Sequence, residues 1–272
     1  MATKTESKRG PHPQDKKLFA EVAWPILSEA VADLSWLRSR GYAEKSSVKI
    51  VGDRYELTAR QRTAVGRSAC GDAALTARTE RRIAIADVRG RVLCVDGFNL
   101  LTTIEAALGG GVLLRGRDGC IRDMSSMHGN YRVLSDTGAA LEFVFKALDR
   151  LKPARVIWYL DKPVSNSGRL KGVIAEVAKG FANFKTEVRL VQDPDPLLKK
   201  LAGTEAVAVS ADSAVIDECG KWTNLADYIL AIFLPDREVI DFTDQFAELQ
   251  CEPEVKSAPM TVVRKITSET AW

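Results

Sequence analysis

Residues 91–101, RVLCVDGFNLL, contain a short apolar run that ends at an acidic residue. The run at 92–95 has the composition of a buried β-strand, and Asp96-Gly97 ends it. The residues that follow, FNLL at 98–101, fit the first turn of a helix. A carboxylate next to a buried strand is costly to bury unless a partner compensates its charge. The first question about this chain is therefore which partner Asp96 has.

Strand and helix patterns alternate along the rest of the chain. Apolar runs predict the strands, and apolar positions at helical spacing predict the helices between them. The predicted strands are 92–96, 154–161, 186–193, 205–212 and 237–242, and the predicted helices are 98–108, 137–151, 165–181, 196–203, 213–220 and 224–233. A hairpin is predicted over 109–126, because Asp118-Gly119 separates two short apolar runs. Five strands separated by helices predict an α/β fold with a mostly parallel, doubly wound sheet of Rossmann type.

A helical pattern precedes this sheet. Apolar residues recur at helical spacing from Lys16 to Arg40, where Pro25 is expected to break or kink the helix. Residues 39–58 are predicted to form a loop, and Thr58 is a candidate N-cap for a helix over 59–82. We therefore expect four parts: a disordered lead-in at 1–15, a small basic helical domain at 16–85, the α/β domain at 86–250 and a tail at 251–272.

The composition is that of an ordinary globular protein, with 46% hydrophobic and 28% charged residues. No apolar run is long enough for a membrane span, and the start of the chain lacks the apolar core of a signal peptide. We therefore expect no membrane partner and a cytoplasmic location. Five cysteines without a CxxC pair predict reduced thiols. Two histidines offer little for a histidine-rich metal site or a serine–histidine triad, so we expect the chemistry to use carboxylates.

The net charge of +3 hides a separation of charge along the chain. Residues 38–91 contain 13 Lys and Arg against 6 Asp and Glu, whereas residues 189–254 contain 5 against 14. A basic part suits a polyanion, and an acidic part suits metal cations. The competing interpretation is that the two parts are solvated faces that attract one another.

Four predicted strands end in aspartate, at Asp96, Asp161, Asp193 and Asp212. Because sites in open parallel sheets form at the carboxyl ends of the strands, these side chains are expected to meet at one edge. Clustered carboxylates repel one another unless a cation lies between them, and oxygen ligands suit Mg²⁺ or Mn²⁺. Aspartate is also common in turns, and Asp193, within QDPDP, is interpreted in that way. Asp96, Asp161 and Asp212 are therefore the predicted metal ligands and catalytic residues.

Other polar residues are predicted to join this site. Asn99 faces the same edge from the first turn of its helix and is predicted to act in catalysis, as a ligand or a hydrogen-bond donor. Helix N-termini bind phosphate, and arginines beside aromatic rings suit phosphate contacts and base stacking. The predicted nucleic-acid-binding residues are Arg115, Arg117, Arg122, Tyr131 and Arg132 around the hairpin, and Ser165, Asn166 and Ser167 at a helix start. The competing interpretations are a solvated hairpin and ordinary helix caps.

Two common nucleotide-binding motifs are absent from the sequence. The segment DGFNLL after the first strand lacks the G-x-G-x-x-G pattern of dinucleotide-binding folds, and no GxxxxGK[ST] phosphate-binding loop occurs. These absences disfavour a dinucleotide-dependent enzyme and a P-loop enzyme.

The motifs VDGFNLL, YLDKPVSNSG and VSADSAVID resemble those of the PIN-like superfamily of metal-dependent nucleases, including its NYN branch. In that superfamily the first strand ends in Asp-Gly-(Tyr/Phe)-Asn, and later strands end in further metal-binding acids. The resemblance places these acids at Asp96, Asp161 and Asp212, and the asparagine at Asn99. Residues 34–67 are similar to a second family, an uncharacterised prokaryotic domain called domain of unknown function 434, which is paired with a PIN-like carboxy-terminal domain.

The resemblance is incomplete at one position. The superfamily has an acid on the helix between its first two strands, for which this chain offers only Glu105, Asp136 or Glu142. The resemblance therefore does not say whether one or two metals bind.

We predict from these observations a Mg²⁺- or Mn²⁺-dependent phosphodiesterase, a nuclease that acts on RNA more readily than on DNA, with a metal-bound water as the nucleophile. The first alternative is a catalytically inactive PIN-like module that binds nucleic acid or a protein and keeps its acids for structure. The second is a phosphotransfer enzyme for a small nucleotide. The sequence leaves open whether the chain forms a homo-oligomer.

Overall fold

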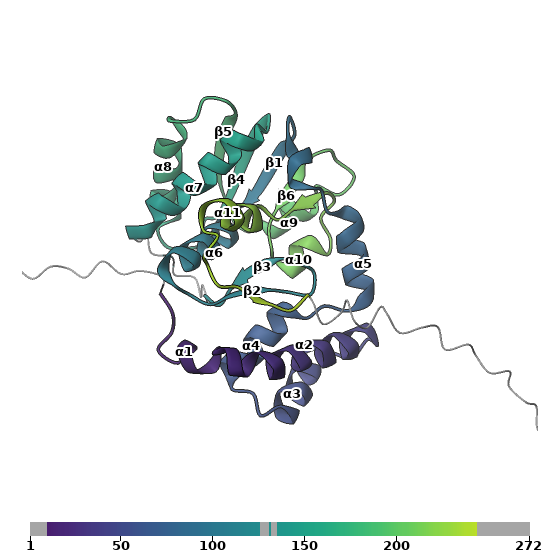
Figure 1. The fold of residues 1–272 in the computed structure, drawn as a ribbon. Helices are drawn as coiled ribbons and strands as arrows, with labels where there is room; N and C mark the ends of the chain where they lie inside the picture. The colour runs from purple at the N-terminus through teal and green to yellow at the C-terminus, as the bar shows by residue number, and fades with distance from the viewer. Residues whose placement is uncertain (1–9, 126–130, 132–134, 244–272) are drawn as a thin grey trace, which may run out of the picture.

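The structure is a computed structural model that describes residues 10–125, 131 and 135–243 (Figure 1). It contains an α/β part built on a parallel sheet and an amino-terminal helical region, which lies below the α/β part in Figure 1. Most of the predicted lead-in at 1–15 and all of the predicted tail at 251–272 fall outside the described residues. Across the described ranges, no helix has both the length and the apolar character that crossing a membrane requires.

Five parallel strands form the main sheet, in the order β5-β4-β1-β6-β7. Their bounds are Lys185–Val191 (β5), Arg155–Asp161 (β4), Val92–Asp96 (β1), Val207–Val209 (β6) and Trp222–Thr223 (β7). Strand order runs outward from β1 in both directions, so the sheet is doubly wound and its switch point lies between β1 and β6. The α/β fold predicted from the sequence is confirmed.

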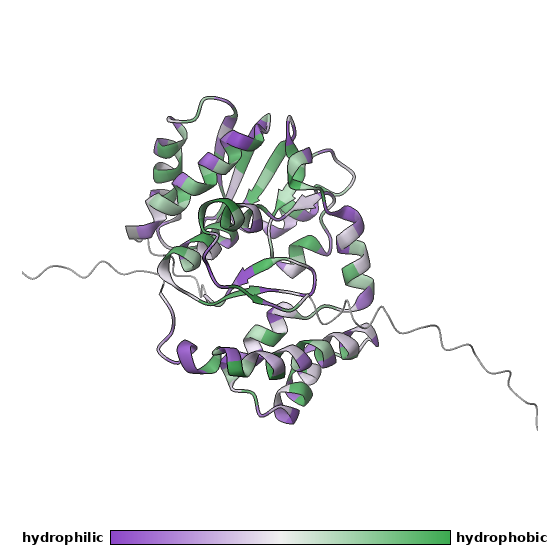
Figure 2. Ribbon diagram, viewed as in Figure 1, coloured by the Kyte–Doolittle hydropathy of each residue, from purple (hydrophilic) through white to green (hydrophobic). Residues whose placement is uncertain are grey.

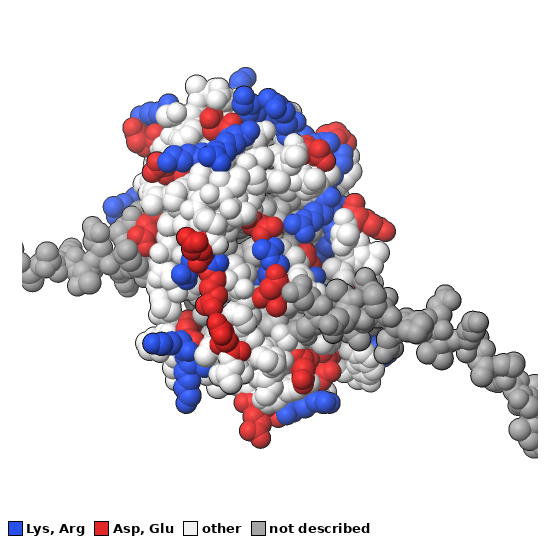
Figure 3. All heavy atoms as spheres, in the orientation of Figure 1, with Lys and Arg blue, Asp and Glu red and all other residues white. Residues whose placement is uncertain are grey.

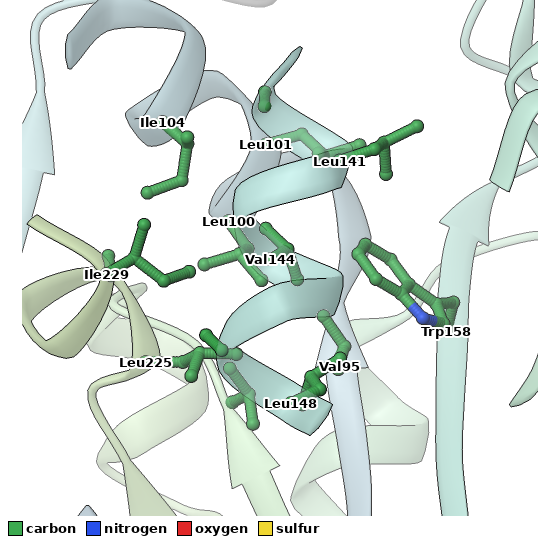
Figure 4. Packing of buried hydrophobic residues seen from close by; sticks show 14 of the residues in the cluster. Val95, Leu100, Leu101, Ile104, Leu141, Val144, Leu148, Trp158, Leu225 and Ile229 are labelled. Atoms are coloured by element: carbon green, nitrogen blue, oxygen red, sulfur yellow. The ribbon is translucent and has the colours of Figure 1, made fainter. Parts of the chain in front are cut away.

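Alternate side chains of the strands pack on opposite faces of this sheet. Val95 and Trp158 point into the larger core, where they meet Leu141, Val144 and other apolar residues (Figure 4). The helices over this face are α6 (Gly97–Gly109), α7 (Ser135–Leu151), α8 (Ser167–Ala178) and α11 (Leu225–Phe233). The opposite face packs against two short helices, α9 (Asp195–Lys199) and α10 (Ser213–Ile216). Figure 2 shows β1 largely green, which agrees with the burial of this central strand.

A second, small sheet lies between the main sheet and the helical region (Figure 1). Its strands are β3 (Ile121–Asp123), β2 (Leu113–Arg115) and β8 (Ile240–Asp241), in that order. β2 and β3 form the predicted hairpin, whose turn contains Gly119 at a φ of +73°. The strand predicted at 237–242 was expected to belong to the main sheet, and this was wrong. It pairs with β2 as β8, because its buried residues Ile240 and Phe242 face the core of the helical region.

The helical region contains more helix than the sequence predicted. Its helices are α1 (Asp15–Leu18), α2 (Trp24–Ser39), α3 (Glu44–Arg54), α4 (Ala59–Ser68) and α5 (Asp72–Arg81), with 3-10 turns at Glu21–Ala23 and Ile85–Val88. The helical pattern that starts at Lys16 is interrupted before Pro25, as expected: α1 ends at Leu18, and Pro25 lies in the first turn of α2. The loop predicted at 39–58 was wrong, because α3 occupies most of it and buries Ser47, Val51 and Gly52 against its neighbours. The helix predicted over 59–82 is two helices, α4 and α5.

The helical region and the small sheet share one apolar core. Its members from the helices include Leu27, Val31, Leu34 and Val65, and those from the sheet include Leu114, Ile240 and Phe242. α5 leaves this core and runs up beside α10 of the α/β part (Figure 1). The two parts of the chain are therefore packed together at the small sheet and along α5.

Candidate functional site

The carboxyl edge of the main sheet opens into a cleft of about 670 Å³. The cleft lies at the switch point between β1 and β6, where doubly wound sheets form their ligand sites. The α/β part lines it with acidic side chains that include Asp96, Asp161, Asp195 and Asp212. The helical region lines it with residues of α3 and α4: Glu44, Val48, Arg62, Thr63, Gly66 and Arg67. Both parts of the chain therefore form the cleft.

Asp96 is the last residue of β1 and the most buried of these acids, with 7% of its surface exposed. Its Oδ2 accepts a hydrogen bond from Ser210 Oγ at 2.9 Å. Burial raises the pKa of Asp96 to about 7, and the negative charges of Asp212 and Asp195 add to this increase. Among the described residues, no cationic side chain forms an ion pair with Asp96. Asp96 therefore has hydrogen bonds from the Ser210 hydroxyl and from the backbone of Asn99, while the acids near it repel its charge.

The segment Ser210–Asp212, which follows β6, is fixed against Asp96 by side chains. Ser210 Oγ accepts a hydrogen bond from the N–H of Asp212 at 3.1 Å, and Asn99 Oδ1 accepts one from the N–H of Ala211 at 2.9 Å. Asp212 Oδ1 accepts a hydrogen bond from the N–H of Ala214 at 2.7 Å and so caps α10. Asn99 therefore lies at the predicted edge of the sheet, and its side-chain oxygen holds this segment in place.

Two further acids line the same cleft. Burial raises the pKa of Asp161, at the end of β4, and the charge of Asp193 adds to the increase. Burial also raises the pKa of Asp195, together with the charges of Asp212 and Asp193. Asp193 has the turn role expected of it, since its Oδ1 accepts a hydrogen bond from the N–H of Asp195 at 3.0 Å. Asp195 was not predicted as a site residue. It begins α9, the helix that follows β5, and this position after a strand is the sequence feature that could have indicated it.

The oxygen ligands at this edge fit a hard cation, which would also compensate the burial of Asp96. Within the described part of the chain, however, no group of three His, Cys, Asp or Glu side chains is arranged to hold one ion. Mg²⁺ is commonly held by one or two carboxylates, and waters and phosphate oxygens complete its coordination. The described acids therefore do not form a site in which protein ligands enclose an ion.

The hairpin arginines predicted to bind nucleic acid already have partners within the protein. Each is paired with a carboxylate: Arg115 with Asp227 and Asp241, Arg117 with Asp72, and Arg122 with Asp118, at distances of 2.7–2.9 Å. These pairs neutralise the guanidinium charges and attach the hairpin to neighbouring helices and strands. Of the three arginines, Arg122 alone lines the cleft.

Tyr131 and the start of α8 form a separate cluster. Tyr131 is fully buried and its hydroxyl donates to Glu105 Oε1, so the predicted stacking on a base does not fit its position. Ser165 and Asn166 both donate to the carbonyl oxygen of Tyr131, and Ser167 donates to that of Lys162. These side chains hold the loop before α8 and lie apart from the cleft. Arg132 falls outside the described residues.

Two arginines of α4 line the cleft and were not among the predicted site residues. Arg62 pairs with Asp53 at 2.8 Å. Arg67 donates to the backbone carbonyl oxygens of Asp123 and Ser125, and among the described residues it has no ion pair with a carboxylate. The sequence feature that could have indicated them was the series of arginines on the predicted helix after Thr58. The sequence did not show that this helix lines the cleft at the sheet edge.

The separated charges of the chain partly meet within the molecule. Arg78 pairs with Asp217 at 2.6 Å, and Arg91 pairs with Glu205 at 2.9 Å, so the basic and acidic segments contact each other. On the face shown in Figure 3, acidic and basic side chains lie interspersed in small groups. The ion pairs agree with the interpretation that the two segments attract one another.

Known families match both parts of the chain. The family described as Domain of unknown function (DUF5616) matches residues 85–228, and the family described as Protein of unknown function (DUF434) matches residues 26–81. The uncharacterized protein MJ0935 of Methanocaldococcus jannaschii is 28% identical over 190 residues, which is 70% of this chain and 88% of that protein. No solved structure matches the chain. The predicted similarity to domain of unknown function 434 is confirmed, and none of these descriptions names an activity.

Proposed function

The chain belongs to the family described as Domain of unknown function (DUF5616), and we propose that it is a Mg²⁺- or Mn²⁺-dependent phosphodiesterase that cleaves RNA. One observation carries the proposal. Acids from separate strands and helices meet in one cleft at the switch point of the sheet, and Asp96, which is buried, has other acids near it. Burying such a carboxylate costs folding free energy, and a bound cation would offset that cost.

Each residue of the site has a role in this proposal. Asp96 and Asp212 hold the cation, and Asp161 and Asp195 add negative charge to the same cleft. Ser210 orients the carboxylate of Asp96, while Asn99 fixes the backbone that presents Asp212. Bound there, Mg²⁺ or Mn²⁺ supplies Lewis acidity that activates water and stabilises charge developing on a scissile phosphate.

The arginines with which the helical region lines the cleft support a polyanionic substrate. Arg67 lines the cleft and donates to two neutral backbone carbonyls, and among the described residues no carboxylate balances its charge; such a group suits a phosphate. The choice of RNA over DNA rests on the resemblance to PIN-like nucleases at Asp96, Asp161 and Asp212, which is part of this proposal. We expect the reaction in the cytoplasm, where buried cysteines such as Cys94 and Cys120 stay reduced.

A second candidate is a module that binds nucleic acid or a protein without cleaving it. One observation favours it: within the described part of the chain, no three metal-ligating side chains are arranged around one ion. In that case the acids at the sheet edge would serve the structure, as Asp212 does when it caps α10.

Replacing Asp96 separates the two candidates. Losing an outer-shell partner of a metal site typically lowers activity roughly 10–100-fold. Asp96→Asn removes a direct ligand in this proposal, so we expect it to lower the cleavage rate by more than that. The measurement is cleavage of labelled single-stranded and structured RNA with Mn²⁺ and with EDTA. Asp87→Asn, at an exposed position away from the cleft, is the matched control and is expected to cleave like the wild type.

The outcomes point in different directions. Cleavage that needs Mn²⁺ and Asp96 supports the phosphodiesterase. Undiminished cleavage by Asp96→Asn would show that the site has been assigned wrongly. Tight RNA binding by both proteins without any cleavage would favour the binding module, and weak affinity for all oligonucleotides would leave the small-nucleotide enzyme.

A further inference from the structure

Four charged side chains form a cluster at the boundary between the helical region and the α/β part. Arg78 of α5 and Arg122 of β3 both contact the carboxylate of Asp118, and Arg78 also contacts Asp217 at the end of α10 with two hydrogen bonds of 2.6 and 2.9 Å. We call Arg78, Asp118, Arg122 and Asp217 the boundary cluster. Its two arginines and two aspartates balance in charge.

The boundary cluster is buried more deeply than most ion pairs of this protein. The side chains of Asp118, Arg78 and Arg122 are 1%, 4% and 8% exposed, and that of Asp217 is 41% exposed. Burial would raise the pKa of Asp118, but the charges of Arg122 and Arg78 hold it well below its ordinary value. Removing one partner of such a buried pair leaves an uncompensated charge, so these side chains have little freedom to move.

This rigid cluster reaches the candidate site through Arg122. Arg122 Nε donates to the carbonyl oxygen of Ala211 at 2.8 Å, on the residue whose N–H is bound by Asn99. Ala211 is therefore held at both of its backbone polar groups, between Ser210 on one side and Asp212 on the other. The segment has little support of its own, since β6 before it spans Val207–Val209 and α10 after it spans Ser213–Ile216.

α5 also holds the far end of α10. Arg81 donates to the carbonyl oxygens of Ile216, Asp217 and Cys219, at 3.1, 2.9 and 2.6 Å. Together with the Arg78–Asp217 pair, these bonds attach the whole of α10, which begins at the cap residue Asp212, to the helical region.

We infer that Arg122 is a positioning residue of the cleft, and that the helical region acts on the site through the boundary cluster. This inference rests on the proposed function. Although Arg122 lines the cleft, Asp118 and the carbonyl oxygen of Ala211 engage its guanidinium, so in this inference it acts by fixing where Asp212 lies relative to Asp96. Misplacing a reacting group by about 1 Å can cost on the order of 100-fold in rate, so such a residue affects turnover from a distance.

The test variant is Arg122→Lys, which keeps the charge but loses the planar fork that contacts Asp118 and Ala211 together. We expect kcat for RNA cleavage to fall about 10–100-fold and Mn²⁺ to bind more weakly, while KM for RNA stays within about twofold. The matched control is Arg60→Lys. Arg60 also makes a two-pronged contact with a buried aspartate, Asp15, but lies outside the cleft, so its kcat should equal that of the wild type.

A second variant covers the case in which Arg122→Lys does not fold. Asp217→Asn changes the exposed end of the boundary cluster and is expected to fold and to lower kcat about threefold to tenfold, since Arg78 loses one ionic partner. Wild-type kcat in either folded variant would overturn the positioning role. Titration of the wild type with Mn²⁺ alone distinguishes a failure of the proposed function from a failure of the positioning role. A wild type that neither binds Mn²⁺ nor cleaves RNA would overturn both.

Discussion

At the scale of single residues, Asp96 places an ionisable group where the fold disfavours its charge. Burial raises the folded-state pKa of Asp96 to about 7, whereas an unfolded chain has an aspartate pKa of about 4. The folded state therefore binds this proton more tightly than the unfolded state does. The resulting contribution to stability is present below about pH 4 and is lost as the pH rises through about 7.

Asp96→Asn is consequently expected to stabilise the cation-free protein at neutral pH while it removes cleavage. The advantage of the variant over the wild type should grow by on the order of 1 kcal/mol per pH unit between about pH 4 and 7 and then level off. The measurement is urea denaturation in EDTA at pH 5 and pH 8. Asp87→Asn, which is exposed, should show no such growth, and a stability difference between wild type and Asp96→Asn that is the same at pH 5 and pH 8 would contradict the raised pKa of Asp96.

The strand-end acids could be predicted from the sequence, because a buried apolar run shows where its strand ends. The state of the arginines could not be predicted in this way. Arg78 lies 40 positions from Asp118 and 139 from Asp217, and only the folded chain brings these groups together. A local excess of arginine therefore indicated a nucleic-acid surface, although most of these arginines are partners of aspartates within the molecule.

At the scale of secondary-structure elements, the apolar periodicity of the sequence identified the helices and strands with long apolar patterns. It missed short or polar elements that are stabilised by packing against another part of the chain. α3 lies within the predicted loop at 39–58, and its serines and Gly52 are poor helix formers, so its local helix signal is weak. A Cβ at Gly52 would lie 2.5 Å from Nε of Arg62 on α4, so a larger residue there would require the Arg62 side chain to move. β7 has two residues, which is too short for any periodic pattern to show.

Thr58 is an element signal that the structure confirms. Its side chain accepts a hydrogen bond from the N–H of Gln61, and the Gln61 side chain in turn accepts one from the N–H of Thr58, which makes a capping box for α4. Thr58→Ala is expected to lower the free energy of unfolding by about 1 kcal/mol. Thr79→Ala, at an exposed position in the last turn of α5, is the control and should change stability by a few tenths of a kcal/mol at most. Equal effects of the two substitutions in urea denaturation would contradict the role of the cap.

At the scale of the whole molecule, the helical region and the α/β part are joined by shared apolar residues and by the boundary cluster. Leu114, Ile240 and Phe242 of the small sheet belong to the core of the helices, and α5 is bonded to α10. Neither part can unfold without exposing apolar surface or leaving buried charges unpaired on the other.

The two parts are therefore expected to unfold together. Differential scanning calorimetry should give one transition whose calorimetric and van't Hoff enthalpies agree. Arg78→Met, which breaks the link between α5 and α10, is expected to lower the midpoint and to broaden or split this transition. Two separate transitions in the wild type would show that the two parts are independent units.

The pairing of β8 with β2 has a consequence for the order of events during synthesis. Phe242 is fully buried in the core of the first helices, and its N–H donates to the carbonyl oxygen of Arg115. The amino-terminal helices are translated first, but the last strand that covers them is translated near the end of the described chain. The part of the protein that leaves the ribosome earliest therefore completes its core late, and until then it presents an apolar face to the chaperones that meet nascent chains.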